Sequence, residues 1–178
     1  MGTNAYTDID SLIDENIDLL RCGLQLIDAL PGELYREGHD RATDGGVGRH
    51  FRHIIEFYER LADPDVTTVD YGSRRRDSRV ESDAVYAATS VTRIIGTLEA
   101  LRGATPDSEL TVVTEILDAE GRAIRTRSST GRELAVLASH TIHHYAIIAL
   151  LLRGSGVKPP EHFGIAPSTL RYAASRPS

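Results

Sequence analysis

Residues 130–153 read TGRELAVLASHTIHHYAIIALLLR, and they predict the last long helix of the chain. A helix start is indicated near Ser129 or Thr130, and Glu133 follows Thr130 by three residues, in the position of a capping box. Gly154 is expected to end the helix. Apolar residues recur at the three- and four-residue spacing of an amphipathic helix, at Leu134, Leu137, Ile148 and Leu152. The segment therefore predicts a helix with one face in a core.

Three further segments show the same helical spacing of apolar residues. They cover residues 8–30, residues 47–61 and, after an N-cap at Ser82 or Asp83, residues 83–102. Four amphipathic helices predict a four-helix bundle. The expected fold class is therefore all-α.

Between residues 110 and 129 the apolar spacing changes to near-alternation on both sides of the Ala-Glu-Gly turn at 119–121. This pattern predicts a small β-hairpin inserted before the last helix. Residues 70–81 are charged and expected to be irregular, and the proline-rich tail 157–178 is expected to be extended. With no repeat and no low-complexity linker, residues 1–178 predict a single domain.

Composition narrows the classes of function. The chain of 178 residues carries a formal net charge of -6, which disfavours non-specific nucleic-acid binding. Cys22 is the only cysteine, so a metal site must use nitrogen and oxygen ligands. The longest uninterrupted apolar candidate, residues 145–152, is far shorter than a membrane span, and the acidic residues 1–18 do not resemble a signal peptide. We expect a cytoplasmic protein without a membrane partner.

Five of the seven histidines lie in two short clusters. At about 100° per residue, His140 and His144 are about 40° apart on the helix surface and about one turn apart along it. Both lie beside the apolar face, whereas His143 points away from it. Two neutral imidazoles on such a face need partners, and a shared metal ion would supply one. Packed or surface histidines satisfied by hydrogen bonds are the alternative, and the pairing favours metal binding.

The predicted second helix offers two candidates for a third ligand. His50 lies closer to the centre of the apolar stripe, and His53 lies at its margin. Helical periodicity alone therefore favours His50.

A resemblance to a known family reverses this choice. The segments GRHFRHIIEFYE (residues 48–59) and SHTIHHY (139–145) resemble the DinB/YfiT-like superfamily, in an uncharacterised subgroup. The resemblance implies an up-down-down-up four-helix bundle in which one histidine of the second helix joins an HxxxH pair of the last helix. Carried onto this chain, the metal ligands are His53, His140 and His144.

The resemblance also implies a function. A three-histidine site leaves coordination positions open, as catalytic metal sites do. The implied activity is that of a metal-dependent enzyme, a thiol-dependent S-transferase or a hydrolase, with metal-bound water or thiolate as nucleophile. The alternative is a non-catalytic metal-binding or stress-associated bundle that acts through protein–protein association. The expected cofactor is one divalent metal ion, zinc or nickel first and iron or copper next. The expected partners are a small-molecule substrate, with a low-molecular-weight thiol as a candidate, and a second copy of the chain in a homodimer.

Several residues are expected around the metal or a substrate, with no catalytic residue assigned. They are His50, His143, Glu56, Tyr71, Arg75, Arg76 and Tyr145.

Residues 74–79 contain a dense basic run of four arginines. If this loop covers the mouth of the bundle, its guanidinium groups could clamp a carboxylate or phosphate. A solvated loop paired with its own acidic residues, Asp70, Asp77 and Glu81, is the simpler interpretation and is favoured at this point.

Overall fold

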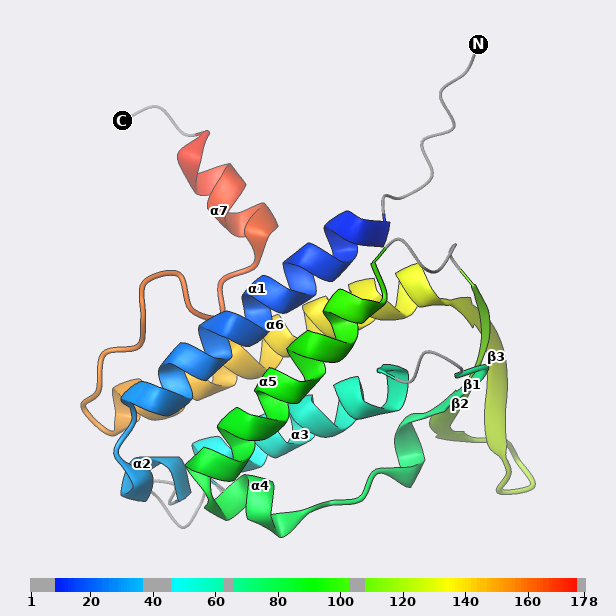
Figure 1. Ribbon diagram of the computed structural model, residues 1–178, viewed down its shortest axis with the longest axis horizontal. Helices are drawn as coiled ribbons and strands as arrows, with labels where there is room; N and C mark the ends of the chain where they lie inside the picture. Colours follow the sequence, from blue (N-terminus) through cyan, green and yellow to red (C-terminus); the bar gives the residue numbers. More distant parts are fainter. Residues whose placement is uncertain (1–8, 37–45, 63–65, 103–107, 176–178) are drawn as a thin grey trace.

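Four long helices form the body of the protein in the computed structural model, which describes residues 9–36, 46–62, 66–102 and 108–175. They are α1 (Ile9–Ala29), α3 (Val47–Leu61), α5 (Ala84–Ala100) and α6 (Thr130–Gly154). Helices α1 and α3 each contact both α5 and α6 (Figure 1). The four helices therefore surround one core.

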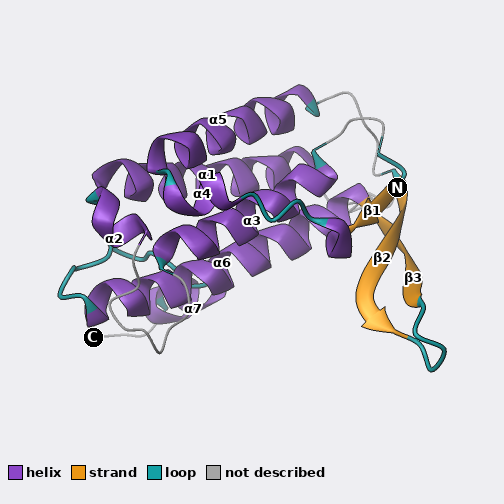
Figure 2. Cartoon of the chain, turned by 90° about the horizontal axis from the view of Figure 1, so that it is seen from below, coloured by secondary structure: helices purple, strands orange, loops and turns teal. Residues whose placement is uncertain are grey.

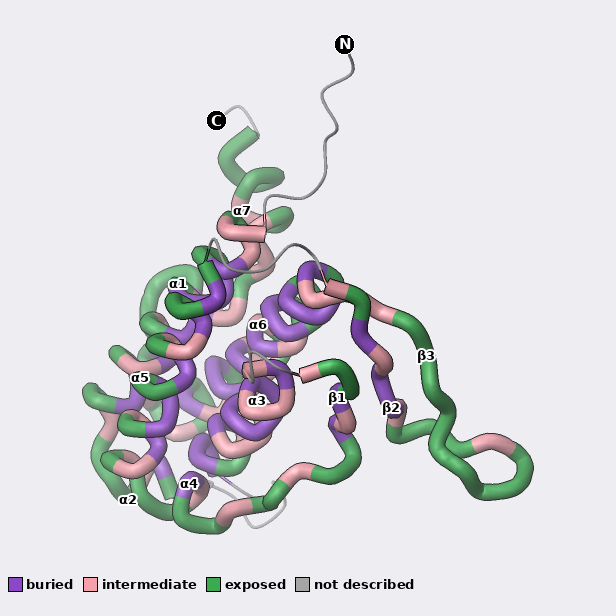
Figure 3. The backbone as a smooth tube through the Cα atoms, turned by 45° about the vertical axis from the view of Figure 1, so that its right-hand side comes forward, coloured by how far each residue is buried: buried purple, intermediate pink, exposed green. Residues whose placement is uncertain are grey.

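The core is built from the apolar faces of these helices. Figure 3 shows that the buried parts of the long helices face one another, while their outer faces are exposed. Burying one large apolar side chain contributes about 1.5–3 kcal/mol, so this face supplies most of the driving force for folding. The largest fully buried side chains include Ile13, Ile17, Leu20, Phe51, Ile54, Ile94 and Leu98.

A buried polar network crosses this core. Tyr58 Oη donates to Asn16 Oδ1 at 2.6 Å, and Asn16 Nδ2 donates to the Leu134 carbonyl at 3.0 Å. Thr141 Oγ1 donates to Tyr58 Oη at 3.3 Å. The network joins α1, α3 and α6, and it fixes the rotation of α6 one residue from His140.

A three-stranded mixed sheet lies at one end of the helices (Figure 2). Strands β2 (Glu109–Leu117) and β3 (Ala123–Ser129) form an antiparallel pair over the range predicted as a hairpin. Strand β1 (Thr68–Asp70) pairs in parallel with β2, with Val69 opposite Val112. Strand β1 fixes the start of the arginine-rich segment that follows it.

The prediction of an all-α four-helix bundle is wrong. The described residues contain seven α-helices and this mixed sheet. The additional helices are α2 (Gly32–Arg36), α4 (Ser78–Ser82) and α7 (Pro167–Ala174), and a 3-10 turn, η1, covers Tyr71–Ser73. Helix α7 lies in the tail that was expected to be extended. Elements of three to eight residues are too short to establish an apolar period, which is why the sequence pattern missed them.

The start of α6 agrees with the prediction, but its capping differs. Ser129 is the N-cap, and its side chain accepts a hydrogen bond from the Arg132 N–H. Glu133 does not complete a capping box; it is buried and hydrogen-bonded to Tyr71.

Helix α6 is long and apolar enough to cross a membrane when judged by length and composition alone. Polar residues such as Ser139 and Thr141 interrupt its apolar sequence. A count of uninterrupted apolar residues therefore does not identify α6 as a helix of this length and composition. Core helices pass the same test, and α6 contacts α1 and α3 and has buried residues from Gly131 to Leu152. Its apolar face is therefore used inside the protein.

Candidate metal centre

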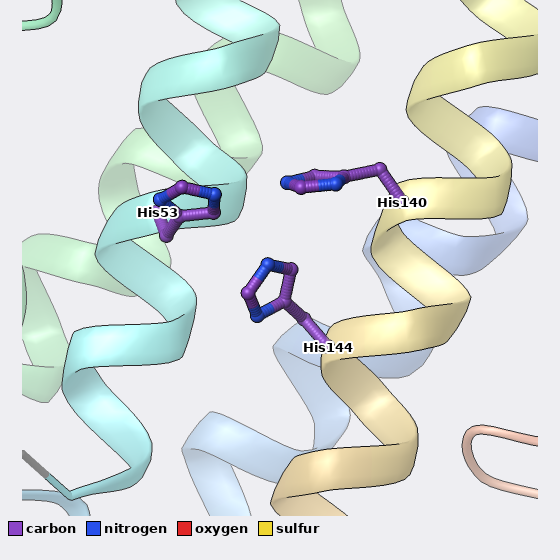
Figure 4. A group of neighbouring side chains, drawn as sticks. All are labelled: His53, His140 and His144. Atoms are coloured by element: carbon purple, nitrogen blue, oxygen red, sulfur yellow. The ribbon is translucent and has the colours of Figure 1, made fainter.

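Three histidines from two helices converge on one point. His53 extends from α3, and His140 and His144 extend from α6 toward it (Figure 4). One ring nitrogen from each of the three lies within 4.8 Å of the other two. The ring centroids are 4.6–5.0 Å apart. The structure thus brings together the three residues that were predicted as metal ligands.

His140 carries an unsatisfied polar atom. Its Nε2 is buried and has no hydrogen-bond partner among the described residues. The ring stacks on Phe57, with centroids 4.4 Å apart, which fixes its orientation. A buried polar nitrogen without a partner is costly and calls for an explanation such as a bound ion. The free nitrogen belongs to one of the three clustered rings.

The histidines of the cluster are neutral at physiological pH. Burial, followed by the repulsion from neighbouring histidines, lowers the pKa of His53 to about 4 and that of His144 to about 3. Burial is also the main cause that lowers the pKa of His140. Metal ions bind neutral imidazole, so the three rings offer lone pairs without first having to lose a proton.

The donor set fits a divalent transition metal. Three imidazole nitrogens suit zinc, nickel, copper or iron(II), and no thiolate is needed. Two nitrogens bound to tetrahedral zinc at about 2.0–2.1 Å are about 3.4 Å apart. The three ligand atoms lie within 4.8 Å of one another, so small rotations about the side-chain bonds suffice to bring them to this distance.

His50 contacts the cluster from one turn earlier on α3. Its Nδ1 lies 2.9 Å from the Nδ1 of His144, a hydrogen-bonding distance. This leaves the Nε2 of His144 as the nitrogen available to a metal. His50 can therefore orient one ligand without being a ligand itself.

Aromatic and acidic side chains form one wall of the site. Phe57 stacks on Tyr71, with ring centroids 4.8 Å apart, and contacts both His53 and His140. Tyr71 Oη donates to Glu133 Oε2 at 2.8 Å, so its hydroxyl is committed to Glu133. Burial and the Glu133 carboxylate raise the pKa of Tyr71 above its usual value. Tyr71 therefore closes the wall as a neutral phenol.

The arginines of residues 74–79 lie in different surroundings. Arg74 forms an ion pair with Glu115 on β2 at 3.0 Å and lies over the Phe57 ring, 4.5 Å from its centroid. Arg76 lines a cavity beside the histidines. Arg79 pairs with Asp77 at 2.9 Å, as expected for a solvated loop.

Three residues predicted near the metal lie elsewhere. Glu56 is buried, accepts the Asp77 N–H at 2.7 Å and lines a separate polar hollow with Arg75. Tyr145 is a core residue whose hydroxyl donates to the Leu19 carbonyl at 2.8 Å.

His143 is exposed and reaches the cluster only through an edge contact with His144, at 5.5 Å between ring centroids. It therefore lies at the rim of the site.

Four residues of the site were not predicted to lie there: Phe57, Glu133, Arg49 and Arg52. Arg49 could have been found, because it lies four residues before His53 and so shares its helical face. Arg52 lies about 100° away from His53 around the helix, so helical spacing does not indicate it. The roles of Phe57 and Glu133 depend on the position of Tyr71, which the pairing of β1 with β2 sets.

Comparison with known proteins indicates a different relationship from the one that the histidine site suggested. The chain is 35% identical over 107 residues to FK506-binding protein 5 of Rhizopus delemar. The matched region is 60% of this chain but spans only 28% of that relative's length. No protein-family model matches the chain, and no solved structure matches it.

These findings contradict the assignment to the DinB/YfiT-like superfamily, because the matching relative carries the name of an FK506-binding protein. The metal-dependent transferase or hydrolase activity that the resemblance implied is contradicted with it. The alternative of a stress-associated bundle acting through protein association has no support either. The geometry of the three histidines does not depend on that resemblance.

Proposed function

We propose that this chain binds one divalent transition-metal ion through His53, His140 and His144. The observation that carries the proposal is the buried Nε2 of His140, which has no hydrogen-bond partner in the described ranges of the chain and belongs to a ring packed against two other neutral imidazoles. A metal ion would satisfy this nitrogen and would offset the cost of burying the three rings.

The surroundings of the cluster support the same proposal. Phe57 holds His140 by stacking, and His50 holds His144 by a hydrogen bond. Ligands that are oriented before the ion arrives lose less conformational freedom on binding.

Titration of the metal-free protein with zinc and with nickel tests the proposal. The wild type should bind one ion per chain, and His140→Ala should lose this binding. His162→Ala is the matched control, because it removes an exposed histidine of the C-terminal segment. Equal binding by the wild type and His140→Ala would refute the proposal.

A second candidate is the binding of FK506, which rests on the similarity to a relative named for that property. A shallow, largely apolar hollow between α1 and α5 is a surface on which an apolar ligand could lie. It is lined by Leu24, Val85 and Ala88, among others. Calorimetric titration with FK506 tests this candidate. Binding that Val85→Asp abolishes would support it, and the absence of saturable binding to the wild type would exclude it.

A further inference from the structure

We propose that the cavity beside the three histidines binds a small molecule through a carboxylate or phosphate group. The cavity has a volume of about 570 Å³ and lies against His53 and His144. Four arginines line it, Arg49, Arg52, Arg74 and Arg76, and no carboxylate is found among its described lining residues. A cavity lined by positive charges attracts anions and raises their local concentration.

Arg74 gives the strongest indication of a ligand. Its side chain is only 9% exposed, and one of its terminal nitrogens is paired with Glu115 at 3.0 Å. The other, Nη1, is buried and has no hydrogen-bond partner among the described residues. A buried guanidinium N–H without an acceptor is costly. An oxyanion in the cavity would supply that acceptor.

Arg76 is held at the cavity by its backbone. Its φ of 54° lies in the left-handed region, which costs a residue with a side chain about 1 kcal/mol. The next residue, Asp77, fixes this conformation by donating its N–H to the buried Glu56.

Unlike Arg52, which pairs with Glu81 at 2.9 Å, Arg76 forms no ion pair or hydrogen bond within the described part of the chain. Its charge is therefore available to a ligand.

The site selects the chemical class of the ligand. The guanidinium groups of Arg74 and Arg76, both in the lining of the cavity, are the groups that bind the oxygens of a carboxylate or phosphate. The volume exceeds that of an inorganic anion and fits a metabolite-sized molecule. A molecule anchored at Arg74 and Arg76 would extend toward the histidines. Only this last step rests on the proposed metal site, because the arginines line the cavity whether or not a metal is bound.

Calorimetric titration of the metal-free protein with inorganic phosphate and with succinate, at low ionic strength, tests the proposal. We expect saturable binding of at least one probe, and the tighter one identifies the anionic group. Arg76→Gln should weaken binding by about tenfold or more. Arg75→Gln is the matched control, because Arg75 is the adjacent residue but lines the separate hollow with Glu56. Absence of binding to either probe, or equal weakening by the two variants, would overturn the proposal.

A crossed measurement separates this proposal from the metal site. Arg76→Gln should keep the zinc affinity of the wild type, whereas His140→Ala should lose zinc and still bind the anion. If His140→Ala kept its zinc, the metal proposal would fail while the anion site stood. If anion binding disappeared in His140→Ala, with its circular dichroism unchanged, the independence of the anion site would be refuted.

Discussion

The Nδ1 atoms of His50 and His144 lie 2.9 Å apart, so two imidazoles join α3 to α6 at the edge of the histidine cluster. Between two neutral rings, one nitrogen must donate and the other accept. For Nε2 of His144 to keep a lone pair for a metal, its Nδ1–H must donate to His50. In that tautomer His50 accepts the Nδ1–H of His144 and leaves Nε2 of His144 free to bind a metal.

Replacing His50 should weaken metal binding without abolishing it. We expect His50→Ala to lower zinc affinity by about 10- to 100-fold, as removal of a group that orients a ligand does. Competition with a chromophoric chelator measures this affinity. An unchanged affinity would show that the hydrogen bond to His144 has no role in the site.

Replacing His53 should be more damaging, because the proposal makes it a direct ligand. His53→Ala should lower zinc affinity by orders of magnitude and by more than His50→Ala does. The same competition assay ranks the two variants. The reverse order would assign the ligand position to His50.

His50 and His53 also show how much of this site the sequence could predict. Helical phase favoured His50, and the resemblance favoured His53. The structure places both in the cluster, with different contacts. Periodicity describes the face of one isolated helix, whereas the contacts depend on how α3 and α6 are rotated against each other. The polar network of Asn16, Tyr58 and Thr141 contributes to that rotation.

Lowered histidine pKa values predict a pH dependence of stability. In the folded metal-free protein, burial lowers the pKa of His53 to about 4 and that of His144 to about 3, below the usual 6.5. Between these values and pH 6.5 the unfolded chain binds more protons, so stability should fall as pH decreases from about 7 to 5. Urea unfolding at several pH values measures this. His144→Gln should show a smaller loss, and a loss as large as that of the wild type would contradict the prediction.

Tyr58→Phe should destabilise the protein by about 1–3 kcal/mol, because it leaves Asn16 Oδ1 buried without its donor. The free energy of unfolding in urea gives this value. Tyr172→Phe is the matched control, since Tyr172 is 65% exposed. A Tyr58→Phe variant as stable as the control would show that the buried network adds no net stability.

Gly48→Ala should also destabilise the protein. A Cβ at Gly48 would lie 2.1 Å from the backbone carbonyl oxygen of Glu81, so α3 and α4 would have to separate, at a cost of about 1–3 kcal/mol. At Gly96 on α5 a Cβ meets nothing within 4 Å, and Gly96→Ala should stabilise by about 0.5–1 kcal/mol. Thermal unfolding compares the two. Equal shifts of Tm would contradict the close contact between α3 and α4.

The positions of the long helices could be predicted because each repeats its apolar spacing over four turns or more. Strand β1 could not, because its three residues pair with a strand about 40 positions later, and no local pattern encodes such a contact. This missed strand has consequences for the site. It positions Tyr71 against Phe57 and brings Arg74 to Glu115. The sheet therefore places the arginine-rich segment next to the histidines.

The central claim is that His53, His140 and His144 hold a metal ion, and elemental analysis tests it most directly. The protein would be expressed and purified without a histidine tag or added metal, alongside His140→Ala and the control His162→Ala. We predict one transition-metal ion per chain in the wild type and in His162→Ala, and a large loss of metal in His140→Ala. A wild type without stoichiometric metal, and no better than His140→Ala after reconstitution with zinc or nickel, would contradict the claim.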